Sequence, residues 1–218
     1  PAIHMLIAWS SSAYGAKDNI PYKETDKSDQ QVSFYAATKK STENMAHSYS
    51  HLFNLPITMF RFFTVYGPWG RPDMALYKFT EAILNGKEID VYNHGNMSRD
   101  FTFIDDLVYG IRILMDIIPD SKSERAEKVL QYDSKSPVAP FRIVNLGNSE
   151  PENLMEFIVA IEKSTQMDAH INMLPMQAGD LPKTWADTRL FEALTGYKPE
   201  TSISKGVESF VRWYREYN

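Results

Sequence analysis

The sequence predicts an α/β fold in which helices cover both faces of a mostly parallel sheet. Short apolar runs rich in β-branched and aromatic residues alternate along the chain with longer segments of helical periodicity. The 218 residues are 43% hydrophobic and 13% aromatic, which is enough for a substantial core. The chain contains no cysteine, so disulfides and thiolate chemistry are excluded.

The expected elements follow from periodicity and from the positions of prolines and capping residues. Phe34, Met45 and Tyr49 recur at helical spacing, and Pro56 closes that region. Ser149-Glu-Pro-Glu has the spacing of a capping box and predicts that a helix opens at Asn153. In chain order we expect strands at 3–9 (buried), 57–63, 89–92, 99–103, 141–146 and 171–174, and helices at 31–52, 73–85, 105–118, 153–163, 188–195 and 204–217. Residues 119–140, with three prolines, are expected to form a solvated loop.

Charge and hydropathy exclude several classes of protein. The net charge of −5 argues against nucleic acid or an anionic membrane surface as the main partner. The longest apolar stretches, such as residues 111–118 with Arg112 and Asp116 inside, are too short and too charged to span a bilayer. No signal peptide opens the chain, so a cytoplasmic location is the default expectation. His47 and His51 have metal-ligand spacing, but no third ligand is evident, and we expect no metal site.

One combination of residues suggests acid–base chemistry on a hydroxyl group. Ser10, Ser11 and Ser12 end the first expected strand, and Tyr35 and Lys39 follow on the next expected helix. A tyrosine and a lysine four positions apart share a helix face, where the ammonium favours the phenolate and makes it a usable base near neutral pH. We therefore expect Ser10, Tyr35 and Lys39 to be catalytic.

Further blocks, at residues 33–40, 61–75, 99–106, 144–148 and 179–180, follow in order along the chain. With the serine, tyrosine and lysine they resemble the extended short-chain dehydrogenase/reductase superfamily, and within it the nucleotide-sugar 4-epimerases, most closely the UDP-glucuronate 4-epimerases. The resemblance implies the C-terminal part of a Rossmann-like doubly wound parallel sheet with a smaller α/β substrate-binding lobe. Residues 1–63, with 100–146, would belong to the NAD-binding domain, and residues 64–99 and 147–218 mainly to the substrate-binding lobe.

The resemblance also implies a mechanism. Tyr35 would take the proton from the sugar C4 hydroxyl while a hydride leaves C4 for bound NAD, and Ser10 would hold that oxygen. Lys39 would bind the nicotinamide ribose, and Phe63 would line the nicotinamide site. The 4-keto intermediate would turn over and take the hydride back on its other face, which inverts C4 without consuming the cofactor.

Substrate contacts are likewise implied by motif position. Related dehydratases and decarboxylases carry carboxylates at the places of Ser11 and Ser12, and neither is present here. We expect Ser11, Ser12, Thr64 and Arg71 to hold a sugar carboxylate. For the UDP part, the implied residues are Tyr92 on the uracil, Arg99 on the diphosphate, Asp180 on the ribose, and Gln177 where many relatives have an arginine toward the phosphates. Trp9, where a small residue is usual, has no predicted effect.

The Gly-rich phosphate cradle of this superfamily is missing from the sequence. We therefore expect the chain to be the C-terminal two-thirds of a larger enzyme, inactive and weak in NAD binding when alone. Two alternatives stay open: a non-catalytic sugar-nucleotide-binding fragment, and another epimerase such as a UDP-glucose 4-epimerase. The resemblance further suggests a homodimer through the helix bearing Tyr35, and a role in polysaccharide biosynthesis.

Overall fold

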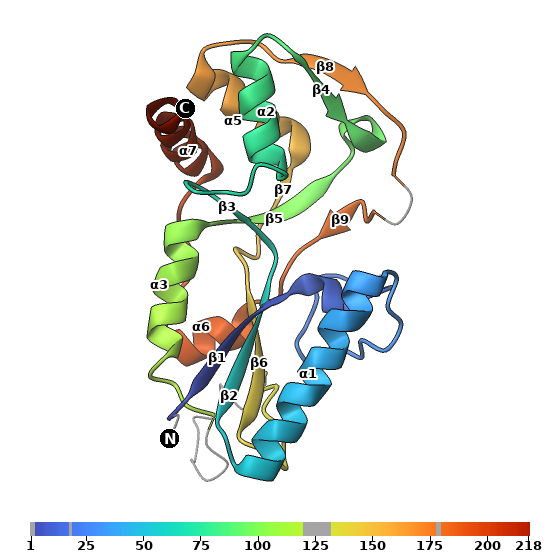
Figure 1. Cartoon of the computed structure of the whole chain (residues 1–218), viewed down its shortest axis with the longest axis vertical. Coiled ribbons are helices and arrows are strands. Elements are labelled where there is room, and N and C mark those ends of the chain that lie inside the picture. The colour runs from blue at the N-terminus through green and yellow to red at the C-terminus, as the bar shows by residue number, and fades with distance from the viewer. Residues whose placement is uncertain (1–2, 18, 120–131, 178–179) are drawn as a thin grey trace.

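The computed structural model describes residues 3–17, 19–119, 132–177 and 180–218. The molecule is elongated, with a larger lobe around one parallel sheet, a smaller helical lobe, and a layer of crossing strands between them (Figure 1). The mixed α/β architecture with helices on both faces of a parallel sheet confirms the predicted fold class.

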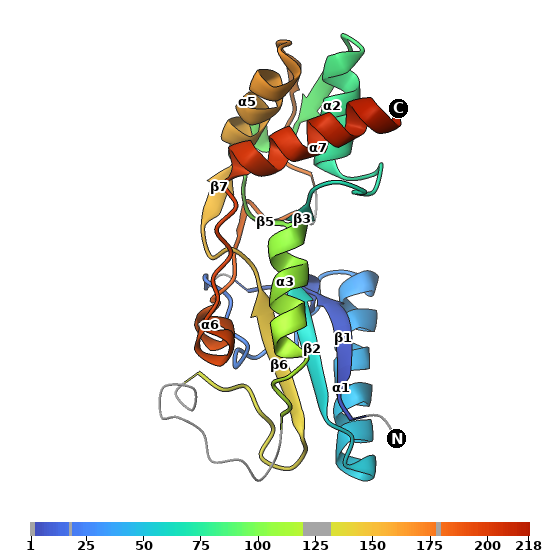
Figure 2. The same cartoon turned by 90° about the vertical axis from the view of Figure 1, so that its left-hand side faces the viewer.

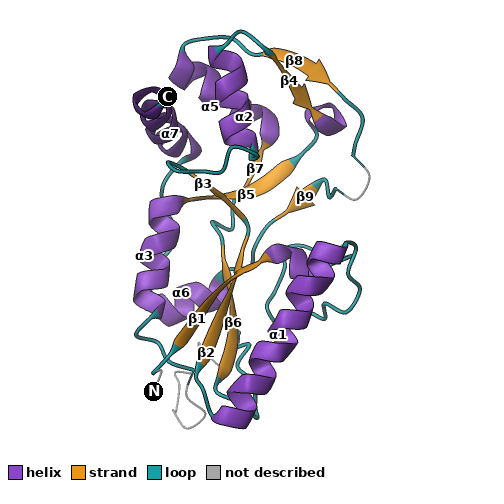
Figure 3. Cartoon of the chain, in the orientation of Figure 1, coloured by secondary structure: helices purple, strands orange, loops and turns teal. Residues whose placement is uncertain are grey.

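The sheet of the larger lobe contains three parallel strands in the order β1 (Met5–Ser10), β2 (Ile57–Phe62) and β6 (Phe141–Leu146). Ser10 pairs with Phe62, which pairs with Leu146, so the three carboxyl ends lie at one edge. Figure 3 shows these strands ending beside the crossing layer. Because parallel strands end together, residues that follow them in sequence meet there.

The two faces of this sheet are covered by different helices (Figure 2). Helix α1 (Phe34–Phe53) covers one face, where Ala46 packs with Ile57 and Met59. Helices α3 (Ile104–Leu114) and α6 (Arg189–Thr195) cover the other, around the buried Phe60 and Phe191. Strand β2 contributes apolar side chains to the cores on both faces of the sheet, since successive side chains of a strand point to opposite faces.

The smaller lobe packs α2 (Ala75–Leu84), α5 (Leu154–Thr165) and α7 (Ile203–Tyr217) around an aromatic core. Beside them β4 (Glu88–Val91) pairs in parallel with β8 (His170–Met173). The crossing layer consists of β5 (Ser98–Phe103) with β3 (Thr64–Tyr66), β7 (Pro151–Asn153) and β9 (Lys183–Thr184). Phe101 of β5 stacks on Phe157 of α5 at 4.3 Å between ring centroids, which fixes this layer to the smaller lobe.

Asp100 of β5 fastens the polypeptide where it passes between the lobes. Its carboxylate accepts backbone hydrogen bonds from Asn148 at 2.6 Å, from Ser149 at 3.1 Å and from Ala186 at 3.0 Å. Chain segments therefore cross the layer several times, and α6 from the late part of the sequence packs on the larger sheet. The division of the chain into two domains by residue ranges stays a prediction.

Two local expectations are wrong. Strand β1 has no buried residue, because it pairs only with β2 among the described strands and so forms a sheet edge. The helix expected at Asn153 begins at Leu154 after a short strand, with Asn153 as its cap, since the Asn153 side chain accepts from the Met155 N–H at 2.8 Å. Ser149, expected to be that cap, instead donates to the Ala186 carbonyl.

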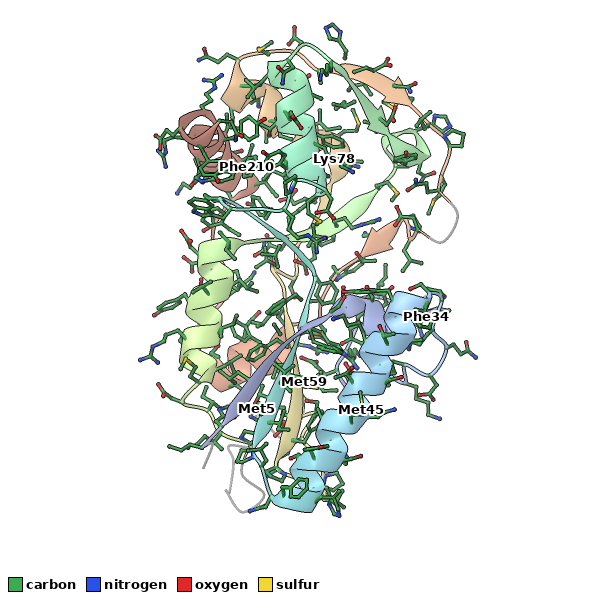
Figure 4. The ribbon with its side chains drawn as sticks, viewed as in Figure 1. Met5, Phe34, Met45, Met59, Lys78 and Phe210 are labelled. Carbon is green, nitrogen blue, oxygen red and sulfur yellow. The ribbon has the colours of Figure 1, made fainter. Side chains whose placement is uncertain are left out.

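The apolar stripe of α1 lies on the surface of the described chain. Phe34 is 87% exposed and Met45 is 56% exposed, and both are labelled on α1 in Figure 4. The helix instead buries Ala36, Glu43 and Ser50. Periodicity shows that a helix has an apolar face, but not what covers that face. The predicted helix is thus present, with its large apolar side chains on the surface.

The two histidines of α1 hold a loop. His47 Nε2 lies 2.8 Å from Ser136 Oγ, and His51 Nδ1 lies 2.7 Å from the Val138 carbonyl oxygen. The described part of the chain contains no group of three or more metal-ligating side chains. Every described helix is also too short or too polar to cross a bilayer. Residues 120–131 of the expected loop lie outside the described residues.

Candidate active site

The serine-rich segment forms a tight turn at the carboxyl end of β1. Ser10 caps the short 3₁₀ helix η1 (Ser11–Tyr14), because its Oγ accepts the Ser12 N–H at 3.1 Å. The Ser10 hydroxyl donates to Ser12 Oγ at 3.0 Å. The turn therefore holds two hydroxyl groups side by side, at the sheet edge where ligands of such folds bind.

Tyr35 and Lys39 occupy the first turns of α1, which opens at this same edge. Ser33 caps the helix by accepting the Ala36 N–H at 3.1 Å. The Lys39 ammonium lies 5.3 Å from the centroid of the Tyr35 ring and 4.2 Å from that of Trp9. Trp9 also donates its indole N–H to the Lys39 carbonyl at 3.0 Å. The unusual tryptophan thus packs under the lysine, within the distance of a cation–π contact.

A cavity of about 640 Å³ opens between the serine turn, α1 and the loop after β3, and we call it the serine cavity. Its lining includes Ser10, Ser12, Tyr35, Thr64 and Arg71. Among the described residues that line it, Arg71 is the only one with a full positive charge. Phe63 is also in the wall, whereas Ser11 and Lys39 are not.

A second cavity, of about 560 Å³, lies between α2, β4 and β5, and we call it the Tyr92 cavity. Its wall includes Tyr92, Lys78, Arg99 and Asp180. Thr64 lines both this cavity and the serine cavity, so the two cavities adjoin. Arg99 donates to Asp180 at 2.8 Å. Burial lowers the pKa of Arg99, and the contact with Asp180 opposes that effect.

The two remaining predicted residues lie apart from these cavities. Ser11 lines a smaller hollow of about 220 Å³ with Ser12, Arg99 and Asp180. Gln177 is exposed, and its carbonyl accepts the Asp180 N–H at 3.3 Å. Gln177 is not in the lining of either cavity. The structure thus gathers most of the predicted residues in one region, while their roles stay predictions.

Sequence reasoning missed Lys78, which Figure 4 marks on α2 and which lines the Tyr92 cavity. It stands one helical turn after Met74, and that spacing from the Arg71 motif was an available indication. It also missed Asn145, a member of a recognised block. Asn145 is fully buried behind the serine turn, where its side-chain oxygen accepts the Tyr14 hydroxyl at 2.7 Å.

A buried ion pair supports the site from below. Arg61 of β2 donates two hydrogen bonds of 2.7 Å to Glu43, which stands one turn after Lys39 on the stripe that carries Tyr35. The Arg61 guanidinium also lies 4.3 Å from the centroid of the Tyr14 ring, beneath the serine turn. One side chain of the sheet therefore contacts both the helix of Tyr35 and the turn of Ser10.

Comparisons with known proteins identify the family of the chain. The model of the NAD dependent epimerase/dehydratase family matches residues 2–126. A probable UDP-glucuronate 4-epimerase of Rhizobium meliloti (strain 1021) is 54% identical over 211 residues, which cover 97% of this chain and 62% of that protein. UDP-glucuronate 4-epimerase 4 of Arabidopsis thaliana is 43% identical over 217 residues, covering 97% of this chain and 48% of that protein.

Among solved structures, the UDP-glucuronic acid 4-epimerase from Bacillus cereus in complex with UDP-glucuronic acid and NAD is similar. Its TM-score is 0.79 at 28% identity, and the match covers 99% of this chain and 62% of that one. The chain thus spans less than two-thirds of the length of these relatives. Because the family model matches more than half of its residues, the chain belongs to the NAD-dependent epimerase/dehydratase family.

Proposed function

We propose that this chain supplies the substrate-binding and proton-transfer part of an epimerase that interconverts UDP-glucuronate and UDP-galacturonate at C4. The observation that carries the proposal is the serine cavity, which brings Ser10 and Ser12 together with Tyr35, Thr64 and Arg71 from separate segments. A hydroxyl donor, a phenol and a guanidinium around one cavity suit a sugar that carries both a reacting hydroxyl and a carboxylate.

In the reaction, the Tyr35 phenolate accepts the proton of the C4 hydroxyl and later returns it. Ser10 donates a hydrogen bond to the C4 oxygen and holds it toward Tyr35. Lys39 keeps a positive charge beside the phenol, and Trp9 holds the lysine in place from below. NAD, when bound, supplies reversible hydride acceptance at C4. Tyr35, Lys39 and Phe63 would hold its nicotinamide end, and the flat apolar walls of Phe62 and Phe63 in the serine cavity fit that ring.

The sugar carboxylate needs restraint, because a 4-keto uronate is a β-keto acid that loses carbon dioxide if its carboxylate aligns with the ketone. Ser12 and Thr64 offer neutral donors in the cavity wall, and Arg71 offers a charged one. Ser11 reaches the neighbouring hollow, so its part in the restraint depends on how the sugar sits. No carboxylate lies at these serine positions to promote elimination of water.

The Tyr92 cavity accommodates the UDP group in this proposal. Tyr92 would stack on the uracil, Arg99 would bind the diphosphate, and Asp180 would bind the ribose. Lys78 adds a second cation in the same wall. Arg99 is paired with Asp180 at 2.8 Å, so the diphosphate would share Arg99 with that carboxylate. Gln177 would reach the phosphates only by moving from its exposed position.

We also propose that the chain binds NAD weakly and does not turn over when alone, since the Gly-rich cradle is not in its sequence. The exposed stripe of Phe34, Met45 and Tyr49 on α1 supports a homodimer, because apolar side chains along a helix are normally covered. We further propose that the enzyme is cytoplasmic and supplies UDP-galacturonate for polysaccharide biosynthesis.

The test compares the chain as given with a chimera that carries the N-terminal portion of the Rhizobium meliloti relative. Both are incubated with UDP-glucuronate and NAD, and UDP-galacturonate is measured by chromatography. We expect product only from the chimera. A chimera that folds and binds NAD but forms no UDP-galacturonate contradicts the proposal and favours a non-catalytic sugar-nucleotide-binding protein. Turnover of UDP-glucose in place of UDP-glucuronate indicates a galactose-type epimerase, and release of carbon dioxide indicates a decarboxylase.

A further inference from the structure

The loop of residues 67–74, which we call the rim loop, joins β3 to α2 at the edge of the serine cavity. It carries Arg71, the only full positive charge among the described residues that line this cavity. The Gly70 N–H donates to the Gly67 carbonyl and the Met74 N–H to the Arg71 carbonyl, each at 3.1 Å. These hydrogen bonds shape the loop locally, but they do not tie it to another element.

Arg71 itself gives the loop no anchor. Its side chain is 73% exposed, and its recorded polar contacts are with Asp73 at 3.0 Å and with the Met74 sulfur at 3.5 Å, both in the same loop. The position of the guanidinium over the cavity is therefore set by whatever holds the backbone of the rim loop.

Trp69 gives the rim loop aromatic side-chain contacts with α7. Its ring centroid lies 5.3 Å from that of Trp213 and 5.0 Å from that of Tyr217, both on α7. Trp213 and Tyr217 stack on each other at 5.3 Å. Trp213 in turn packs at 5.3 Å on Phe210, a fully buried residue that also lines the serine cavity. The rim loop is thus connected to the core of the smaller lobe through aromatic rings.

The backbone of Trp69 is strained, as expected of a residue whose contacts hold the rim loop in place. Its φ of +63° is in the left-handed region, which a bulky side chain rarely adopts. Such a conformation persists when surrounding contacts hold it, and strained residues of this kind gather at ligand sites. Trp69 is 71% exposed, so general burial does not account for the conformation, whereas the two ring contacts with α7 do.

We propose that Trp69, Trp213 and Tyr217 form an aromatic clip that positions Arg71 over the serine cavity and makes the C-terminal helix a determinant of specificity for an acidic sugar. The proposal rests on the proposed function, because it concerns the sugar that the cavity accepts. The three aromatic residues are positioning residues, since they act on the carboxylate only through Arg71. An anchored rim loop loses less conformational entropy when Arg71 pairs with that carboxylate. The clip therefore raises the affinity for acidic sugars relative to neutral ones.

The experiment measures binding of UDP, UDP-glucuronate and UDP-glucose to the chain by calorimetry. The quantity of interest is the preference for UDP-glucuronate over UDP-glucose. Trp213→Leu and Trp69→Gly remove the clip. Tyr217→Phe keeps the aromatic ring and serves as the matched control. Arg71→Leu gives the reference value of the preference when the guanidinium is absent. We expect Trp213→Leu and Trp69→Gly to lower the preference about tenfold, toward the Arg71→Leu value, while UDP affinity is unchanged. Tyr217→Phe should behave like the wild type.

A double variant separates positioning from a general loss of structure. If the clip acts through Arg71, adding Trp213→Leu to Arg71→Leu lowers the preference no further. The ¹⁹F resonance of 5-fluorotryptophan at position 69 reports how firmly the rim loop is held. Trp213→Leu should narrow the linewidth of this resonance and move its chemical shift toward that of free 5-fluorotryptophan. Unchanged preference in both clip variants, with a wild type that prefers UDP-glucuronate, overturns the clip and leaves the proposed function standing. A wild type that binds UDP and both sugars equally overturns the substrate class and the specificity role together.

Discussion

Removing the charge of Arg61 should destabilise the chain severely, and this prediction can be worked out from the buried ion pair. Arg61 is 1% exposed and Glu43 is 2% exposed, and two hydrogen bonds of 2.7 Å join them. Burial alone would raise the pKa of Glu43, but the hydrogen bonds and charge of Arg61 hold this pKa below its ordinary value. Arg61→Met leaves that carboxylate buried with only Lys40, at 3.0 Å, to offset its charge.

The magnitude follows from the cost of an uncompensated buried charge. Breaking a buried pair from one side costs about 3–5 kcal/mol. Loss of the guanidinium from the Tyr14 ring, at 4.3 Å, adds about 1 kcal/mol. Since the free energy of unfolding of a domain is about 5–15 kcal/mol, Arg61→Met should remove about a quarter of it or more.

The double variant Arg61→Met with Glu43→Leu is the decisive control. It replaces the pair by apolar side chains of similar volume and lets Lys40, which is partly exposed, turn to solvent. Such replacements are often neutral or stabilising, so the double variant should regain most of the lost stability. Urea unfolding followed by circular dichroism gives the free energies. A double variant no more stable than Arg61→Met, or a single variant that loses less than about 1 kcal/mol, would refute the reasoning.

Three further predictions concern pH, turnover and packing. Burial raises the pKa of Glu24 to about 7 from 4.5, so its stabilising contribution is complete below pH 4.5 and is lost as pH rises through 7. Glu24→Gln should therefore raise the free energy of unfolding by about 3 kcal/mol at pH 8 and change it little at pH 5, as urea unfolding at both pH values will show. Tyr35→Phe in the chimera should abolish formation of UDP-galacturonate while UDP still binds by calorimetry, and equal loss of both contradicts a role in proton transfer. Gly206→Ala would place a Cβ 2.3 Å from the Tyr66 hydroxyl, so it should lower the thermal midpoint by several degrees, at a cost of about 1–3 kcal/mol, and a midpoint equal to the wild type would show that Tyr66 moves freely.

Sequence patterns were most reliable where a local rule decides the structure. The strand at β6 agrees at both ends, and α2, α3, α6 and α7 lie within their expected ranges to a few residues. The serine turn and the Tyr35 helix meet as expected, because parallel strands end at one edge of their sheet. The cap of α5 differs from the prediction, because Ser149 donates its hydroxyl hydrogen bond to the distant Ala186 carbonyl and does not cap the helix.

The sequence by itself determined the alternation of strands and helices, the family, and which side chains could do chemistry, since all of these depend on residue types at short spacing. Only the tertiary structure decided that Phe34 of α1 faces outward, that Arg61 is buried under the serine turn, and that Trp69 packs on Trp213. These outcomes depend on contacts between residues far apart in the chain. Local periodicity carries no information on such contacts, because the packing of distant segments settles which faces are covered.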